Sequence, residues 1–67
     1  MPITLTNREI EILKLIAIEQ TTEQIAKSLN IGISTVETHR YNMFRKLNVQ
    51  SVVGLVREGL KNGWIEI

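Results

Sequence analysis

The stretch Ser34–Leu47, which reads STVETHRYNMFRKL, determines how the rest of this sequence is interpreted. On a helix that turns about 100° per residue, Val36, Met43 and Leu47 fall on one narrow apolar stripe. The opposite side carries side chains with hydrogen-bonding or charged groups, namely Ser34, Thr38, Tyr41 and Arg45, flanked by Glu37 and Asn42. We therefore predict a helix that packs on its own domain through one face and presents the other face to a polar partner.

Size and composition limit what this helix can belong to. The chain has 67 residues, no cysteine and one histidine, with 43% hydrophobic and 22% charged residues. These values predict one globular domain, residues 1–67, that is too small for a catalytic cleft of ordinary size. The absence of cysteine excludes disulfides and fits a reducing compartment, so we expect a cytoplasmic protein. No apolar run approaches the roughly 18 residues that a membrane helix needs, and no signal-peptide pattern is present.

The distribution of charge is more informative than its sum. The formal net charge of +1 is weak evidence for a nucleic-acid partner. Three of the eight basic residues nevertheless lie within Ser34–Leu47, namely Arg40, Arg45 and Lys46, whereas six of the seven acidic residues lie outside it. The stretch is therefore locally basic in a nearly neutral chain.

Helix-start signals and apolar spacing predict four helices, at residues 7–18, 22–29, 34–47 and 52–62. Thr6 and Glu9 have the spacing of a capping box for the first helix, and Thr21 and Gln24 have that spacing for the second. Asn30 is expected to end the second helix in a left-handed conformation. No segment is better interpreted as a strand, so the predicted fold class is all-α, a compact four-helix domain.

The start of the third helix is left open by the sequence, and with it the role of Glu37. Gly32 is one candidate for the N-cap residue. Ser34 is the other, and Glu37 would then close a Ser-x-x-Glu capping box. An ion pair with Arg40, three residues further on, is another role open to Glu37.

The fourth helix offers a candidate surface for a second copy of the chain. Its inner stripe is expected to consist of Val53, Val56 and Leu60. Val52 and Leu55 then lie partly outside that stripe, as a dimer surface or as part of a wider core face, and we favour the dimer surface. Gly59 within this helix is expected to weaken it by about 0.5–1 kcal/mol.

The second and third helices, joined by a turn at Asn30, form a candidate helix-turn-helix motif. Ala26 is small enough to let the two helices cross closely. In this arrangement the later helix enters the major groove of DNA, and hydroxyls and N–H groups at helix starts meet phosphates. The expected phosphate contacts are Thr22, Ser34, Thr35, Arg45 and Lys46. The alternative for Arg45 and Lys46 is a solvated last turn that complements the helix dipole.

Five segments together resemble the LuxR-type (GerE-like) helix-turn-helix domain. They are Leu5-Thr6-x-Arg8-Glu9, Ile25-Ala26, Thr35-Val36-Glu37-Thr38-His39-Arg40, Arg45-Lys46-Leu47-x-Val49 and Gly63. The resemblance implies a DNA-binding domain of bacterial transcription regulators, with 34–47 as the recognition helix. It also implies that Glu37, Thr38 and Tyr41 contact bases, and these three residues belong to the polar side of the helix or border it. The chain departs from the family at Glu19 and Asn48, where glycine is frequent.

The resemblance extends to partners and to the rest of the regulator. It implies double-stranded DNA as ligand and a homodimer formed through the helix at 52–62, with RNA polymerase as a further partner. It also implies that such a domain usually follows a receiver or ligand-binding domain, as in two-component response regulators. The chain is therefore expected to be the C-terminal piece of a longer protein, and a freestanding small regulator is the alternative. No cofactor, metal site or enzymatic activity is expected, and His39 is assigned a half-buried structural role. The alternative function is a helical protein-interaction module without DNA binding.

Overall fold

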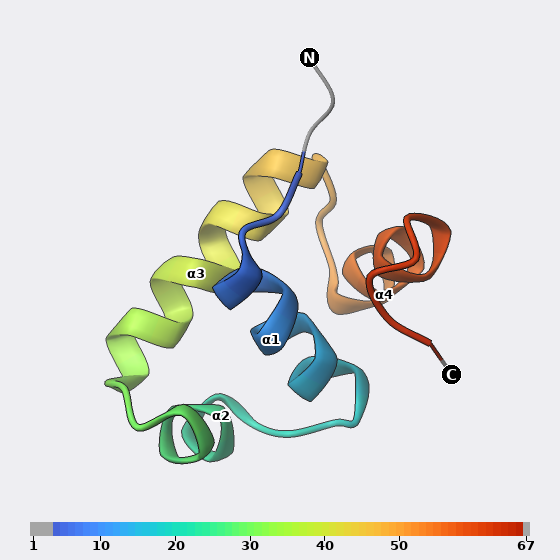
Figure 1. Ribbon diagram of the computed structural model, residues 1–67. Helices are drawn as coiled ribbons and strands as arrows, with labels where there is room; N and C mark the ends of the chain where they lie inside the picture. Colours follow the sequence, from blue (N-terminus) through green and yellow to red (C-terminus); the bar gives the residue numbers. More distant parts are fainter. Residues whose placement is uncertain (1–3, 67) are drawn as a thin grey trace.

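All four helices predicted from the sequence are present in the structure, a computed structural model that describes residues 4–66 (Figure 1). They are α1 (Asn7–Ala17), α2 (Thr22–Leu29), α3 (Ile33–Leu47) and α4 (Val52–Lys61). Each observed end lies within one residue of the predicted one, and the all-α fold class is confirmed. None of the helices in this described part of the chain is long and apolar enough to cross a membrane.

Reciprocal capping fixes the starts of the first two helices. The Glu9 N–H donates to the Thr6 hydroxyl oxygen at 3.1 Å, and the Thr6 N–H donates to the Glu9 carboxylate at 2.8 Å. In α2 the Gln24 N–H donates to the Thr21 hydroxyl oxygen at 3.2 Å, and the Thr21 N–H donates to the Gln24 side-chain oxygen at 2.8 Å. Each pair satisfies two backbone donors that the helix itself would leave unpaired, which confirms both capping boxes.

The third helix begins differently, and this settles which residue caps it. Gly32 is the N-cap, it makes no side-chain hydrogen bond, and Ile33 is the first helical residue. Ser34 therefore lies inside the helix, and the Ser34–Glu37 capping box does not form. Of the two alternatives that the sequence left open, the structure selects Gly32.

Three non-glycine residues with positive φ end helices or shape turns. Asn30 (φ 56°) caps α2 and Asn48 (φ 53°) caps α3, both in the left-handed conformation that asparagine tolerates. Glu19, in the turn after α1, has φ 65° and lacks the short side chain that makes this conformation accessible to asparagine. Positive φ is thus found at both positions where the family frequently has glycine.

The core lies where α1 meets the other three helices. In Figure 1, α1 runs through the centre, with α3 on one side, α4 on the other and α2 across the lower end, and α3 contacts all three of the others. The buried apolar residues are Leu5, Ile12, Leu13, Ile16, Ile25, Ala26, Val36, Met43, Leu55 and Ile65. Ile65 belongs to the segment after α4, which folds back onto the core. Since α3 is held from behind by three helices, its outer face is presented on a rigid support.

The inner face of α4 differs from the prediction. Leu55 and Gly59 are buried, whereas Val53 is 69% exposed and Leu60 is 41% exposed. The helix is rotated so that glycine meets α1, where a Cβ on Gly59 would lie 2.8 Å from Leu13 Cδ2. The assignment of Leu55 to a dimer surface is therefore wrong, because its side chain is completely enclosed by its own domain. Val52, at 38% exposed, remains available on the surface.

Candidate nucleic-acid interface

Backbone hydrogen bonds close the turn between α2 and α3. The Asn30 N–H donates to the Lys27 carbonyl at 3.3 Å, and the Ile31 N–H donates to the Ala26 carbonyl at 3.0 Å. Both carbonyls belong to the last turn of α2, and the Ala26 carbonyl also accepts from the Asn30 N–H. Ala26 is buried, and Val36 on α3 is completely buried. The predicted helix-turn-helix arrangement is therefore present, with α3 fixed at a defined angle to α2.

Most of the predicted contact residues lie together on the outside of α3. The exposed ones are Ser34, Thr35, Glu37, Thr38, Tyr41 and Arg45. Thr22, at the start of α2, is half-buried. On the opposite side of α3, Val36 and Met43 have no exposed surface. The division into an apolar inner face and a polar outer face, which the sequence predicted, is confirmed.

Thr38 makes one hydrogen bond within α3. Its hydroxyl donates to the Ser34 carbonyl oxygen at 3.0 Å, one turn earlier in the helix. The hydroxyl proton is therefore occupied, and the group retains acceptor capacity together with a methyl group. This fixes which chemical groups Thr38 can offer to a ligand without a change in its side-chain conformation.

Tyr41 and Arg45 contact each other on the exposed surface of α3. The Arg45 guanidinium carbon lies 5.7 Å from the centre of the Tyr41 ring, within cation–π range. Tyr41 is 61% exposed, so the contact restricts a large side chain that its own domain covers only in part. A phenol hydroxyl and a guanidinium group are thus presented side by side.

Glu37 has neither of the structural roles that the sequence left open for it. The ion pairs found among residues 4–66 are Arg8–Glu11 at 3.7 Å and Lys46–Glu9 at 2.7 Å, so Glu37 does not pair with Arg40. The capping role is excluded by the start of α3 at Ile33. The Glu37 carboxylate is exposed and available to a ligand.

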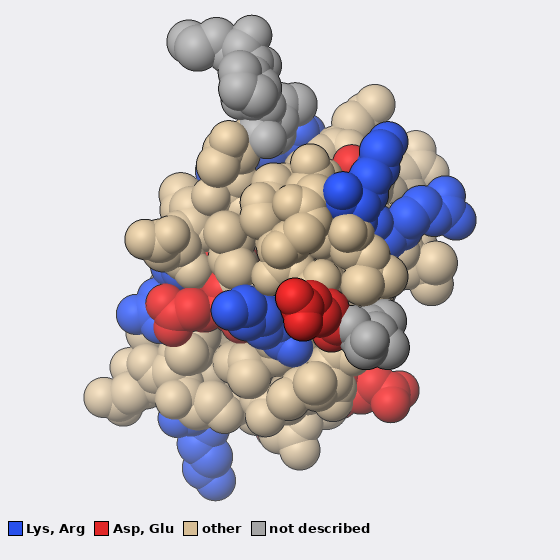
Figure 2. Space-filling view, turned by 45° about the vertical axis from the view of Figure 1, so that its right-hand side comes forward, with Lys and Arg blue, Asp and Glu red and all other residues tan. Residues whose placement is uncertain are grey.

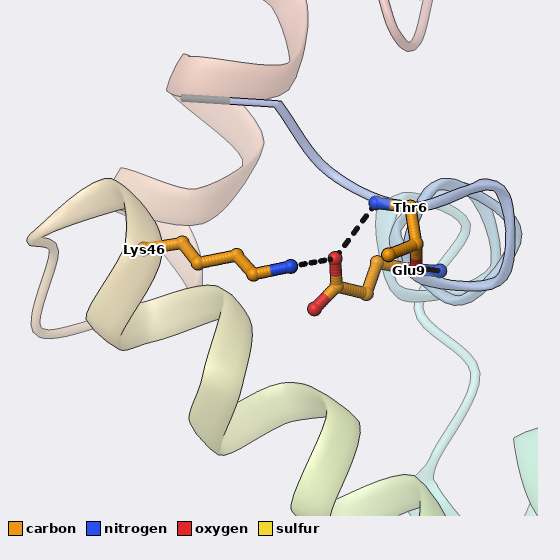
Figure 3. Close-up of polar contacts among 3 residues, drawn as sticks. All are labelled: Thr6, Glu9 and Lys46. Atoms are coloured by element: carbon orange, nitrogen blue, oxygen red, sulfur yellow. Dashed lines mark hydrogen bonds and ion pairs between the residues drawn. The ribbon is translucent and has the colours of Figure 1, made fainter. Parts of the chain in front are cut away.

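Lys46 is turned away from the outer face of α3, towards the start of α1 (Figure 3). Its ammonium lies 2.7 Å from Oε1 of Glu9, a carboxylate that is only 2% exposed. Burial by itself raises the pKa of the Glu9 carboxyl, but hydrogen bonds from Lys46 and from the Thr6 N–H outweigh it and hold the pKa below its ordinary value. In the structure the Lys46 ammonium is thus bound to Glu9, and its contact with a DNA phosphate stays a prediction.

The surface charge is mixed. Figure 2 shows Lys and Arg side chains alternating with Glu side chains across one face, in keeping with the net charge of +1. Residues 4–66 contain no group of three or more His, Cys, Asp or Glu side chains that could hold a metal ion. His39 and Arg40 are half-buried. On α3 itself the exposed charged residues are one acid, Glu37, and one base, Arg45, so uncharged hydrogen-bonding groups outnumber charges on its outer face.

Ile33 is a surface residue that the sequence reasoning did not consider. It is 46% exposed and is the first residue of α3. Starting the helix at Ser34 left Ile33 in the preceding turn, where its direction could not be inferred. The signal that would have placed it correctly is Gly32, since an N-cap at Gly32 makes Ile33 the first helical residue.

A protein-family model described as bacterial regulatory proteins of the luxR family matches residues 3–58. The chain belongs to this family. It is a helix-turn-helix DNA-binding domain of transcription regulators, which are not enzymes. The resemblance noted in the sequence is confirmed over most of the chain.

Relatives and solved structures agree with this assignment. The uncharacterized response regulatory protein YgeK of Escherichia coli K12 is 49% identical over 59 residues, which cover 88% of this chain and 40% of YgeK. The structure of the transcription factor GerE matches with a TM-score of 0.88 at 34% identity, covering 92% of both chains. A VqmA–ligand–DNA complex from Vibrio cholera matches with a TM-score of 0.83 at 28% identity, covering all of this chain and 29% of the other. The chain spans less than half of the length of YgeK.

Proposed function

We propose that this domain binds double-stranded DNA sequence-specifically, with the N-terminal half of α3 in the major groove. One observation carries the proposal: Glu37, Thr38 and Tyr41 are exposed on α3, while Val36 and Met43 fix the opposite face of the same helix in the core. The major groove is wide enough to admit an α-helix, and base edges there differ in their donors and acceptors. A rigidly supported helix with exposed polar side chains fits that groove.

The three base-contacting residues differ in what they can recognise. A carboxylate such as Glu37 accepts a hydrogen bond from N4 of cytosine. Thr38 offers acceptor lone pairs and a methyl group, because its hydroxyl proton is bonded to the Ser34 carbonyl. The Tyr41 hydroxyl can donate or accept a hydrogen bond, and the Arg45 guanidinium packs over the Tyr41 ring. Glu37 repels phosphates, so its presence favours readout of a base over binding to the backbone.

Contacts to the DNA backbone would fix the register of the helix in the groove. Thr22, Ser34 and Thr35 bring hydroxyls to the first turns of α2 and α3, where free N–H groups also point outward. Arg45 adds a positive charge on the exposed face of α3. Among residues 4–66 its guanidinium forms no ion pair with a carboxylate, so it is available to a phosphate. These groups contact any sequence alike, so they contribute affinity and orientation.

Two copies on an inverted repeat would extend the contact to two half-sites. The surface of α4 is apolar at three exposed side chains, Val52, Val53 and Leu60, and a second copy of the domain can pack against them. The membership in a family of bacterial regulators supports three further proposals: a cytoplasmic location, RNA polymerase as a partner, and a place for residues 1–67 within a longer regulator, such as a response regulator.

The test is selection of bound duplexes from a random library, followed by titration of the selected duplex at several salt concentrations. We expect affinity to fall steeply with salt because phosphate contacts release counterions. Thr38→Ala and Tyr41→Ala should change the preferred bases, whereas Arg45→Ala should weaken all sequences alike and reduce the salt slope by about 1. Lys61→Ala, a lysine in the last turn of α4, is the control and should leave the base preference unchanged.

Absence of binding at high micromolar protein and low salt would refute the proposal. The alternative, an interaction module that acts through α4 alone, draws its support from Val53, which is 69% exposed. It predicts self-association or partner binding that survives Thr38→Ala and Tyr41→Ala, with no duplex enriched in the selection.

A further inference from the structure

Ile33 is an exposed aliphatic side chain at the leading end of the recognition helix. It is the first residue of α3 and is 46% exposed, whereas Ile12, Ile16 and Ile25 are buried in the core. Part of Ile33 lines an open hollow beside α2, together with Ala26 and Ile31. Contacts within the domain therefore bury about half of the Ile33 surface, and the other half remains exposed to solvent.

The position of Ile33 makes it continuous with the residues proposed to contact bases. Ile33, Glu37 and Tyr41 follow one another at intervals of four residues, and such residues are neighbours on the surface of a helix. The next interval leads to Arg45, and there the contact is seen directly, since the guanidinium lies over the Tyr41 ring. Ile33 is thus the apolar first member of a row along the outer side of α3.

The chemistry of an isoleucine restricts what it can recognise in the groove. Its side chain has no donor and no acceptor, so it cannot bind a phosphate or the polar edge of a base. The apolar group that base pairs present in the major groove is the C5-methyl of thymine. On this ground, and resting on the DNA binding proposed above, we propose that Ile33 recognises the methyl group of a thymine near the base that Glu37 contacts.

The geometry of the helix limits where that thymine lies. Four residues of α-helix advance about 6 Å along the axis, and stacked bases are about 3.4 Å apart. The thymine is therefore expected within about one or two base pairs of the position that Glu37 contacts. Gly32 keeps the approach open, because even an added Cβ would meet only the hydroxyls of Ser34 and Thr35, at 3.9 and 3.7 Å.

The experiment replaces thymine by deoxyuridine, which removes only the methyl group and keeps the base pair. Each thymine of the duplex selected by the wild-type chain is replaced in turn, and the dissociation constants of wild type and Ile33→Ala are measured. Burial of one methyl group corresponds to about a fourfold change in affinity. We expect one replacement to weaken wild-type binding about fourfold and to leave Ile33→Ala unaffected.

A matched control separates this contact from a general loss of affinity. Ile18→Ala makes the same truncation at another exposed isoleucine, 66% exposed at the end of α1, and should keep the wild-type response to deoxyuridine. Ile33→Val retains a branched aliphatic group and should keep part of the response. Circular dichroism of each variant checks that the helices form.

Three outcomes would overturn the proposal while leaving DNA binding intact. They are a selected site without thymine in the expected interval, wild-type binding that no deoxyuridine replacement weakens, and an Ile33→Ala variant that responds as the wild type does. Failure of the wild type to bind any selected duplex would instead refute the DNA-binding function on which the inference rests.

Discussion

The Lys46 ammonium lies 2.7 Å from the Glu9 carboxylate and joins the C-terminal end of α3 to the N-terminal end of α1 (Figure 3). The same carboxylate oxygen accepts the Thr6 N–H at 2.8 Å, so one buried acceptor serves both the cap of α1 and the contact with α3. The two residues are 37 positions apart in the sequence. This pair therefore fixes the recognition helix relative to the centre of the domain.

We expect removal of Lys46 to destabilise the domain more than removal of the Glu9 charge. Lys46→Met leaves a buried carboxylate without a counter-ion and should lower the free energy of unfolding by about 2–4 kcal/mol. Glu9→Gln retains an acceptor for the Thr6 N–H, as Gln24 does for Thr21 in α2, and frees an ammonium that can reach water. Its effect should be about 1–2 kcal/mol.

Urea unfolding at neutral pH measures this asymmetry. Lys61→Met is the control, since Lys61 occupies the last turn of α4 as Lys46 occupies that of α3, and it should change stability by less than about 0.5 kcal/mol. Equal effects of Lys46→Met and Glu9→Gln would show that the carboxylate is not held in the buried state that the structure describes.

The lowered pKa of Glu9 predicts how stability depends on pH. A carboxyl whose pKa is lower in the folded state contributes stability that is present above its unfolded pKa, about 4.3, and is lost as pH falls through the folded pKa. The free energy of unfolding of the wild type should therefore decrease from about pH 5 downward. In Glu9→Gln this contribution is absent, so the decrease should be shallower.

Urea midpoints measured from pH 6 to pH 3 test this dependence. Glu11→Gln serves as the control, because the Glu11 side chain is 54% exposed and its contact with Arg8 is long, at 3.7 Å. It should leave the slope close to that of the wild type. A Glu9→Gln profile as steep as the wild-type profile would contradict the assignment of this contribution to Glu9.

The parts of this fold that follow from local rules could be predicted, and those that depend on how helices rotate could not. Capping boxes at Thr6 and Thr21 and the left-handed residue at Asn30 act within a few residues, so sequence spacing reveals them. Leu55 was misplaced because burial of α4 depends on the close approach that Gly59 permits, and nothing in the sequence of α4 alone indicates which of its apolar residues faces α1.

In the candidate site, too, some features follow from local sequence patterns and others depend on how the helices pack. The outer face of α3 follows from the helical period, and Glu37, Thr38 and Tyr41 lie where that period places them. The partner of Lys46 is 37 positions away, beyond the reach of any local pattern. Ile33 was missed because its direction depends on whether Gly32 or Ser34 is the N-cap residue of the helix, and local propensity does not decide between them.

Glu19 is a site where a substitution should stabilise the domain. Its φ of 65° is unfavourable for a residue with a long side chain, and glycine adopts it freely. Glu19→Gly should raise the free energy of unfolding by about 0.5–1 kcal/mol after the greater freedom of the unfolded chain is counted. Asn30→Gly, at φ 56°, is the comparison and should gain less, because asparagine already tolerates this conformation. Destabilisation by Glu19→Gly in thermal or urea unfolding would contradict this account.

Gly59 is a site where a better helix former should be harmful. Alanine favours the helix by about 1 kcal/mol, but its Cβ would lie 2.8 Å from Leu13 Cδ2 and 2.9 Å from Ile65 Cγ1. Overpacking in a filled core costs about 1–3 kcal/mol, so Gly59→Ala should be destabilising on balance. In the background of Ile65→Ala, which removes one of the crowding groups, the same substitution should be less harmful. Additive effects of the two substitutions would contradict this explanation.

The exposed apolar side of α4 leads to a prediction about assembly on DNA. Val53 is 69% exposed, and Leu60 lies two turns further along the same side of the helix. At a twofold interface each side chain lies near its counterpart in the second copy, so Val53→Asp would place two carboxylates close together without a counter-ion. We expect binding to a duplex with two selected half-sites to weaken about tenfold or more, with binding to one half-site unchanged.

Ile18→Asp adds the same charge at the exposed end of α1 and should leave both affinities unchanged. Equal loss on single and double half-sites would place Val53 outside the interface between copies.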